Sequence, residues 1–362
     1  MSLILFEFMH KLKFLFIVLA MSTAFPLYAQ TGGYGTHKFL TLPNSARITA
    51  LGGYCIASVD ADLNNVAQNP ALLNAKMDNR YAFNTCNYFG DISYGYLGTA
   101  FSMNRYGTFG IGIQYIDYGN FELTNEYGDI LGNFNAKENS LNFSYAYTRQ
   151  LFSYGASIKT VFSQLAEYDA RAVLLDLGGT YADTINGFTA SFVLKNIGAQ
   201  TNTFSNEKET MPFEAQFGIS KKLAHAPFRF SLTLHNLQRF DLTYLDPNQR
   251  TTQIDLATGL PILQEFSFTD KLLRHVAIGT EIIFSENMQF RVGYNHQKRK
   301  ELGLETRLST VGFSWGFGLK ISKIRFNYGS ANNHLAGYTN MVSLIVNPND
   351  FFKKKISLPS LI

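Results

Sequence analysis

Residues 311–321 read VGFSWGFGLKI and alternate large apolar side chains with small or polar ones throughout. The large set is Val311, Phe313, Trp315, Phe317, Leu319 and Ile321, and the intervening set is Gly312, Ser314, Gly316, Gly318 and Lys320. A two-residue period places each set on its own face of a β-strand. A tilted strand of about ten residues is long enough to cross a bilayer. The stretch therefore predicts a transmembrane strand with lipid on one side.

The same alternation recurs along most of the chain, for example at Phe228, Phe230 and Leu232. It predicts an all-β fold, a single-chain transmembrane antiparallel β-barrel of about 14 strands, with an N-terminal plug-like segment that contains a short helix. The predicted strands span 79–89, 91–103, 106–118, 139–151, 154–166, 169–182, 187–197, 212–223, 227–240, 273–285, 287–296, 306–321, 323–330 and 338–347.

The connections between these strands differ in length in a regular way. Those after even-numbered strands are short, whereas 119–138, 198–211 and 241–272 are long loops that follow odd-numbered strands. Outer-membrane barrels have short periplasmic turns and longer external loops. The pattern therefore predicts an outer-membrane protein with both termini in the periplasm.

The composition agrees with a barrel in outer-membrane lipid. The 362 residues are 15% aromatic and only 16% charged, with 29 Gly, and the mean hydropathy is −0.05. Alternation dilutes apolar residues in this way. The net charge of +4 is small and its basic residues are scattered, which excludes a nucleic-acid partner.

The chain divides into four predicted parts. Residues 1–29 read as a signal peptide, for which Met9 is an alternative start, and residues 348–362 read as a periplasmic tail. Residues 30–78 lack strand alternation and form a plug or hatch segment, and 79–347 form the barrel. Asn69 followed by Pro70 is a helix-start signal within the plug.

The two faces of the strands predict two surroundings. The aromatic face would meet lipid, and tyrosines near the strand ends would form interfacial girdles. The girdle candidates are Tyr88, Tyr94, Tyr118, Tyr147, Tyr294, Tyr328 and Tyr338. The other face carries mixed charges that predict ion pairs inside the barrel: Lys159, Asp176, Lys195, Glu214, Arg229, Glu281, Arg291, Lys320 and Arg325. A secreted β-sandwich is the soluble alternative, but the polar face is too rich in Gly and Ser to form its core.

No motif predicts an enzyme, a cofactor or a metal. Gly312 to Gly316 match G-x-S-x-G, but an unbroken strand contains them, whereas a nucleophile elbow needs a strand, a sharp turn and a helix. Asp60 and Asp62 lack the oxygen-rich frame of a calcium loop and predict a solvated turn. Cys55 and Cys86 are expected to be packed, unpaired thiols, although secretion would permit a disulfide.

A resemblance rests on the N-terminal stretch and the two strands after it. The plug motif residues are Ser45, Ala46, Arg47, Leu51, Gly52, Gly53, Asn69, Pro70 and Ala71. With residues 31–33, 39–44, 87–95 and 112–119, they resemble the PorQ family of outer-membrane barrels in the type IX secretion system of Bacteroidota. The small-residue stretch ending in Asn69-Pro70-Ala71 is also similar to the inner segment of the wider superfamily of fatty-acid-channel-like and PorV-related barrels.

This resemblance implies a non-enzymatic barrel in the attachment complex that processes and anchors secreted cargo. The implied partners are a PorZ-like surface protein, a PorU-like sortase and a PorV-like barrel. Residues 119–138 and 241–272 are then the candidate docking surfaces, and the second contains Phe240, Tyr244, Leu245, Pro261, Ile262, Leu263 and Phe266. The alternative is a fatty-acid-channel-like transporter of hydrophobic small molecules. For that alternative, the Gly-rich inner face leaves room for a pocket, but the same room could hold residues 31–78.

Overall fold

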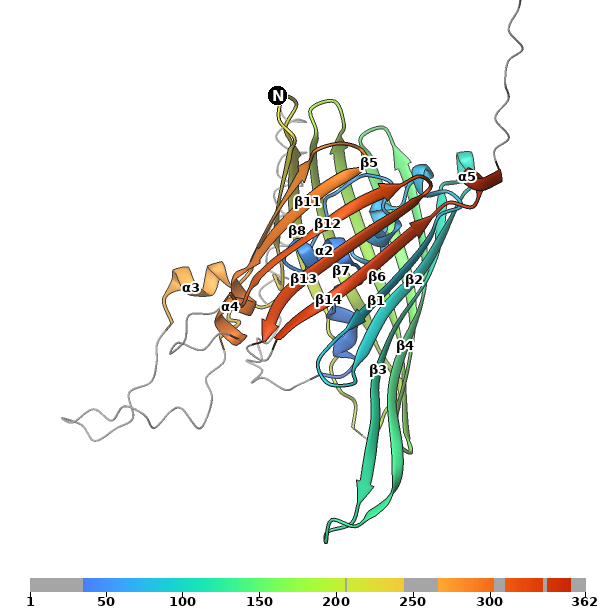
Figure 1. Cartoon of the computed structure of the whole chain (residues 1–362), viewed down its shortest axis with the longest axis vertical. Coiled ribbons are helices and arrows are strands. Elements are labelled where there is room, and N and C mark those ends of the chain that lie inside the picture. The colour runs from blue at the N-terminus through green and yellow to red at the C-terminus, as the bar shows by residue number, and fades with distance from the viewer. Residues whose placement is uncertain (1–34, 206, 244–265, 303–309, 335–336, 353–362) are drawn as a thin grey trace, which may run out of the picture. The chain divides into compact units, whose positions relative to one another are not determined.

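The computed structural model describes residues 35–205, 207–243, 266–302, 310–334 and 337–352. Its 14 strands form one closed antiparallel barrel around the N-terminal segment (Figure 1). The strands are β1 Tyr81–Asn87, β2 Ser93–Ser102, β3 Thr108–Thr124, β4 Ile130–Arg149, β5 Phe152–Leu165, β6 Tyr168–Asp183, β7 Phe188–Asn202, β8 Glu214–Lys222, β9 Phe228–Leu234, β10 Val276–Ile283, β11 Met288–Asn295, β12 Phe313–Ile321, β13 Ile324–His334 and β14 Gly337–Val346.

Each strand pairs with its sequence neighbours, and β1 closes the barrel on β14 with Tyr81 opposite Val346. The predicted fold class and strand number are confirmed. We call the end where β1 begins and β14 ends the terminal end, and the opposite end the loop end. At the terminal end β4, β6 and β12 turn within two to four residues (150–151, 184–187 and 322–323), and the long connection between β9 and β10 lies at the loop end.

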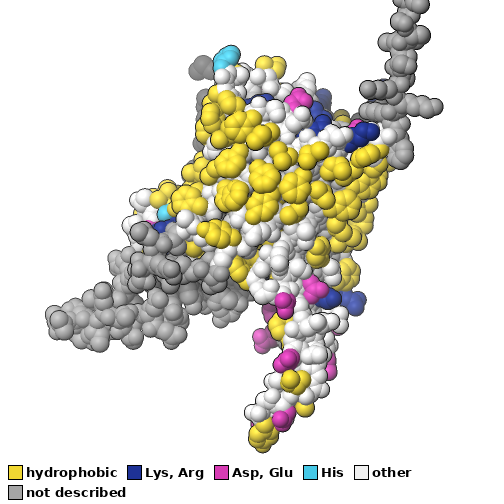
Figure 2. Space-filling model, in the orientation of Figure 1, with side chains coloured by type: hydrophobic (Ala, Val, Ile, Leu, Met, Phe, Trp, Pro, Cys, Tyr) yellow, Lys and Arg dark blue, Asp and Glu magenta, His cyan; other side chains and the backbone are white. Residues whose placement is uncertain are grey.

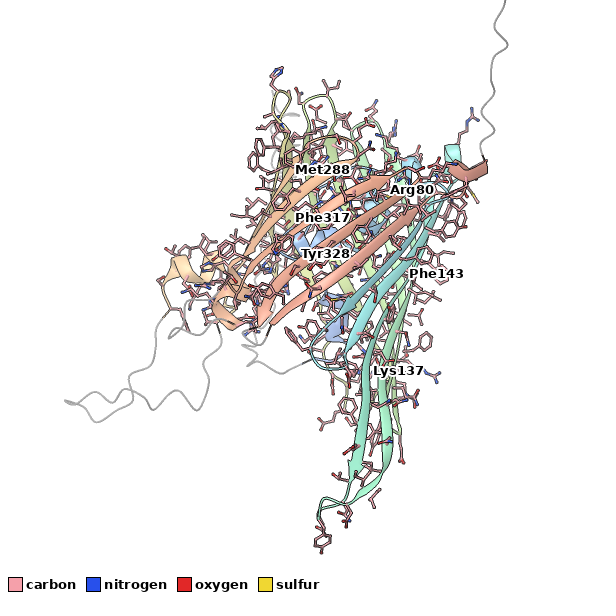
Figure 3. The ribbon with its side chains drawn as sticks, in the orientation of Figure 1. Arg80, Lys137, Phe143, Met288, Phe317 and Tyr328 are labelled. Atoms are coloured by element: carbon pink, nitrogen blue, oxygen red, sulfur yellow. The ribbon has the colours of Figure 1, made fainter. Side chains whose placement is uncertain are left out.

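The outer wall is an apolar belt. Figure 2 shows apolar side chains in a band across the visible face of the barrel, with charged side chains gathered toward its two ends. Phe143 on β4 is 50% exposed and Trp315 on β12 is 42% exposed, and Figure 3 shows the outward side chain of Phe143. Such an aromatic belt around a closed barrel matches the apolar phase of a membrane.

The plug lies inside the barrel as short helical turns. These are η1 Lys38–Thr41, α2 Ala46–Ala50, η2 Leu63–Ala67, η3 Pro70–Leu72 and η4 Ala75–Met77. Helix α2 contacts β11 to β14, and η3 contacts β4 to β6. The room left by the small inner residues therefore holds the plug.

One predicted loop is a pair of strands. Residues 119–138 were expected to form an external loop, but β3 and β4 continue as a two-stranded ribbon that turns at residues 125–129 and projects from the loop end (Figure 1). The prediction was wrong because both faces of the ribbon meet water. Without lipid on one side, its sequence alternates only in short pieces, at Asn120 to Thr124 and Asn133 to Ala136, which are shorter than a membrane-spanning strand.

Other differences concern element ends. Strand β7 runs to Asn202, so the predicted loop 198–211 begins later, and the described part of β12 begins at Phe313 rather than at residue 306. Residues 244–265, within the predicted loop 241–272, lie outside the described residues, as do residues 1–34 and 353–362. The loop end also carries α3 Phe268–Leu273 and α4 His296–Leu302, and α5 Asn349–Phe352 follows β14. Among the described residues, no helix combines the length and apolarity needed to span a membrane.

Candidate functional site: the plug and the wall that holds it

Glycines on the inner wall let the plug backbone lie directly against the strands. A Cβ atom at Gly155 or Gly178 would collide with the Asn69-Pro70-Ala71 turn, and one at Gly293 would collide with the Gly52 nitrogen. By contrast, Gly179 on the outer face has open space around it. The wall is therefore shaped to this plug, since only glycine permits so close an approach of two backbones.

The plug motif builds two capped turns. Ser45 is the N-cap of α2 and its hydroxyl accepts a hydrogen bond from the Ile48 nitrogen, while the Ala46 nitrogen donates to Ser343 on β14 at 2.8 Å. Leu51 then packs beside Gly279 on β10. The helix ends in Gly52 and Gly53, whose φ angles of 85° and 91° are unfavourable for other residues.

The second turn is fixed by Asn69. Its Oδ1 accepts from the Ala71 nitrogen at 2.9 Å, and Pro70 occupies the first position of η3. Its Nδ2 donates to the Ile56 carbonyl and to Thr180 on β6 at 2.9 and 3.0 Å. Asn69 thus caps a turn and ties it to the wall, which a carboxylate could not do without losing both donated hydrogen bonds.

Arg47 lies at the centre of a buried ionic cluster that joins plug to wall. Its Nε and Nη2 donate to the two oxygens of Glu281 on β10 at 3.0 and 2.9 Å. Its Nη1 lies 2.7 Å from Asp60 and 3.3 Å from Asp62. We call Arg47, Asp60, Asp62, Arg229, Glu281 and Arg291 the ionic cluster, in which Arg229 and Arg291 each lie 2.9 Å from Glu281.

Charge in the ionic cluster is balanced, with three guanidinium groups and three carboxylates. Burial alone would lower the pKa of the Arg47 guanidinium, but the carboxylates of Asp60, Glu281 and Asp62 raise that pKa above its ordinary value. Burial would likewise raise the pKa of Asp60, yet Arg47 and Arg229 hold it below its ordinary value. The expected solvated turn at Asp60 and Asp62 is therefore wrong, because both carboxylates serve as partners of a buried arginine.

The prediction of paired charges inside the barrel is confirmed at a second place as well. The ammonium group of Lys159 on β5 lies 2.6 Å from Asp176 on β6 and donates to Asn196 at 2.9 Å. Lys195 faces Glu214 in the register of β7 and β8, and both are buried. The predictions for Lys320 and Arg325 were wrong: Lys320 is exposed and Arg325 half-buried at the terminal-end turn between β12 and β13.

Toward the loop end the lumen is apolar. We call this packed set the apolar lumen cluster: Phe39, Leu40, Ala46, Cys86, Tyr94, Ile116, Val161, Ala172, Leu174 and Met341. Tyr88 and Tyr118 pack against it. The predicted interfacial position was thus wrong for Tyr88, Tyr94 and Tyr118, which pack inside the barrel. The sequence signal that could have shown this is their position on the same strand face as small residues.

A hydrogen-bonded group of polar side chains lies beside the apolar lumen cluster. His37 Nδ1 lies 2.9 Å from Glu138 on β4 and 2.9 Å from Ser163 on β5. Tyr118 donates its hydroxyl proton to the same carboxylate at 2.7 Å. Neither His37 nor Glu138 was predicted as a site residue, because nothing in a spacing of 101 residues indicates contact.

Neither Ser314 nor the cysteines form a reactive site. Ser314 lies on β12, where its hydroxyl accepts from the Gly52 nitrogen and donates to the Ala50 carbonyl, both at 3.0 Å. Cys55 and Cys86 are free and buried, as expected. Within the described ranges, no group of three or more His, Cys, Asp or Glu side chains could hold a metal ion.

The predicted docking loop is described only at its two ends. Phe240 is 52% exposed and packs against Phe268 of α3, with ring centroids 5.6 Å apart. The Arg274 guanidinium lies 5.0 Å from the ring of Phe266. The remaining predicted residues lie outside the described residues: Tyr244, Leu245, Pro261, Ile262 and Leu263.

The fold has counterparts among solved structures. A deletion mutant of the monoaromatic hydrocarbon channel TodX matches at 13% identity and a TM-score of 0.51, over 84% of this chain and 98% of that chain. The monoaromatic hydrocarbon channel CymD matches at 14% identity and a TM-score of 0.50, over 84% and 97%. No family model matches the sequence, and no curated protein matches it. These two likenesses show the fold, a closed β-barrel like those of the two hydrocarbon channels.

Proposed function

We propose that this protein is a non-enzymatic outer-membrane channel for small hydrophobic molecules. The observation that carries the proposal is the apolar lumen cluster, which lies inside a plugged barrel whose fold is that of two monoaromatic hydrocarbon channels. The free energy of a hydrophobic solute falls when it leaves water for such surroundings. An interior filled by the plug would meanwhile resist the free passage of water and ions.

A solute can pass through the barrel only if part of the plug moves. Phe39 and Leu40 belong to the plug and also to the apolar lumen cluster, so a bound hydrocarbon would compete with them for the same wall. The ionic cluster involves other residues of the plug, and within it Arg47 would keep α2 in place. We infer that residues 37–42 move while α2 stays fixed.

Uptake of a labelled monoaromatic compound and a labelled long-chain fatty acid tests the proposal. The channel would be expressed in a Gram-negative host that lacks its own hydrocarbon channels. Leu40→Asp should abolish uptake by placing a charge in the apolar lumen cluster. Lys38→Asp, an exposed position on the same turn, is the matched control and should not. Equal uptake by Leu40→Asp and the unaltered protein would overturn the proposal, provided that both variants are folded.

A second candidate function is favoured by a different observation. Exposed aromatic side chains gather around α3 at the loop end, where Phe268 is 68% and Phe240 is 52% exposed. Exposed apolar patches mark protein-binding surfaces. With the termini in the periplasm, this patch would face outward. It could then hold a PorZ-like surface protein and a PorU-like sortase beside a PorV-like barrel, as the resemblance to the PorQ family implies.

Affinity purification from detergent-solubilised outer membranes of the native host separates the two candidates. Recovery of a sortase-like protease and a large surface protein supports the attachment role. Loss of both with Phe268→Ser and Phe240→Ser would assign the contact to this patch. A barrel that purifies alone, from membranes in which such proteins are abundant, speaks against the attachment role.

A further inference from the structure

The β3–β4 ribbon leaves the outer edges of both its strands without a partner among the described residues, since β3 pairs with β2 only as far as Asp117 opposite Ser93. The edge of β4 is the one that carries a groove. Strand β4 pairs with β5 only as far as Ala136 opposite Leu165, after which β5 ends and the Asn135 carbonyl accepts the Ala166 nitrogen. Residues 130–134 of β4 pair with β3 on one side. On the other side, no strand among the described residues continues the ladder. An open edge of this kind is a template for pairing with another chain.

A groove lies along this edge. It has a volume of about 820 Å³ and is lined by Asn133, Phe134 and Lys137 of β4 together with Gln164 of β5 and the following Glu167 and Tyr168. These residues belong to the edge of β4 and to the turn where β5 leaves it, so the groove begins where the pairing of β4 with β5 ends. The groove therefore lies where an added strand would pair with β4.

The side chains of the ribbon are suited to a partner. Tyr127 is 83% exposed, Ile130 62% and Leu131 65%, which is unusual at the tip of a ribbon in water. Figure 2 shows acidic side chains along the ribbon. They include Glu122, Glu126 and Asp129, and Glu167 lies at the adjacent turn. Lys137 at the base of the ribbon (Figure 3) is paired with Asp117 at 3.1 Å.

The acidic side chains of the ribbon determine which kind of chain could pair with the open edge of β4. A second copy of this chain would bring the same carboxylates face to face, and such like-charge contacts oppose association. A basic segment would instead be attracted by them. We propose that the open edge of β4 binds an extended, basic segment of another protein by β-strand addition, with its apolar residues against Ile130, Leu131 and Phe134.

The register of the bound strand follows from the ladder. The Asn135 carbonyl points toward β5, so the backbone N–H and C=O groups of Asn133 point to the same edge, two residues further along. These groups are available to the added strand. The inference goes beyond both functions proposed above and requires neither, because it depends only on the ribbon.

The test uses the full-length barrel in a zwitterionic detergent. The probe is a synthetic peptide of about ten residues that alternates Lys with Val or Tyr, and its counterpart carries Glu in place of Lys. Binding is measured by fluorescence anisotropy, and the contact is located by hydrogen exchange of the amides in residues 130–134. Only the Lys peptide should bind, and it should slow exchange there roughly tenfold or more.

Two variants assign the contact. The combined change Glu122→Gln, Glu126→Gln and Asp129→Asn should weaken binding at least about fivefold, whereas Asp183→Asn at a terminal-end turn is the matched control and should not. Asn133→Pro removes the N–H on the open edge and should abolish protection while leaving β3 paired. Equal binding of both peptides, or protection elsewhere than on this edge, would overturn the proposal. So would protection that appears without peptide and grows with protein concentration, because that result would mean self-association.

Discussion

Arg47 in the plug and Glu281 on β10 share two parallel hydrogen bonds of 3.0 and 2.9 Å, both inside the barrel. The pair joins a residue near the start of the described chain to one 234 positions later. Two-point pairing of this kind fixes orientation as well as distance. It makes Glu281 the wall residue on which the position of α2 depends.

Glu281→Gln should destabilise the barrel by about 3–5 kcal/mol, because it leaves three buried guanidinium groups with two carboxylates. Urea titration in detergent micelles measures the free energy of unfolding. The double variant Arg47→Met with Glu281→Met keeps the remaining charges balanced and should cost less than the single change. If Glu281→Gln cost under about 1 kcal/mol, the ionic cluster would be solvated rather than buried.

Gly155→Val should displace the Asn69-Pro70-Ala71 turn, because its side chain would collide with the backbone of Pro70 and Ala71. Overpacking of this kind costs roughly 1–3 kcal/mol, and the plug should become sensitive to added protease while the barrel stays folded. Gly179→Val on the outer face of the next strand is the control. A protease-resistant Gly155→Val plug would mean that the turn does not touch the wall.

Cys55 offers a built-in reporter of the plug. Burial, the largest influence, raises the pKa of its thiol to about 12, and the thiolate is the form that reacts. In a Cys86→Ser variant, maleimide labelling should be slow at pH 8 and should quicken with each pH unit up to pH 10. A labelling rate that levels off near pH 9 would instead show that the Cys55 thiol is exposed to water. Cys55 packs with Ile48 and Leu51, so the same labelling, repeated with a monoaromatic compound present, tests whether this part of the plug stays fixed.

Asp241 provides a pH test at the loop end. Burial would raise its pKa, but hydrogen bonds from Lys271 and Thr243 lower it to about 2. Because the folded pKa is lowered, the stabilisation is present above the ordinary value of 3.8 and is lost as the pH falls through about 2.

Carbon-13 titration of the Asp241 carboxyl should show its midpoint near 2, and Lys271→Met should return it toward 3.8. The side chain of Asp241 is 48% exposed, so the ion pair should contribute no more than about 1 kcal/mol at pH 7. An unchanged midpoint in Lys271→Met would show that the two residues do not interact in solution.

The barrel could be predicted from the sequence because lipid and lumen impose a two-residue period on every strand that separates them. Phe313 to Ile321 carry that signal plainly, and so does β4 within the membrane. The signal weakened in the ribbon, where water lies on both sides of residues 118–135 and the alternation at Asn120 to Thr124 covers only five residues. There only the turn residues near Asn125 and Gly128 indicated that the chain reverses.

The residues of the plug motif were identified from the sequence, but most of the contacts that they make were not predicted. Asn69-Pro70 predicted a helical start, and one turn does begin at Pro70. The surroundings of Arg47 could not be predicted, since Glu281 and Arg229 belong to strands far away in the sequence and only the packing of the plug inside the barrel brings Arg47 to them. Tyr94 was assigned to the membrane interface for a different reason: it was judged by its place near the strand end, although it shares a face of β2 with Gly98 and Ala100.

The wall glycines that touch the plug belong to strands on different sides of the barrel, among them Gly155 on β5, Gly293 on β11 and Gly329 on β13. The plug is made before any of these strands, yet its binding surface is complete only when the last of them pairs with the first. Residues 35–78 therefore find their complete binding surface only after β14 has paired with β1. Contacts between residues so far apart in the sequence form slowly, so we expect the plug to reach its final position late in folding.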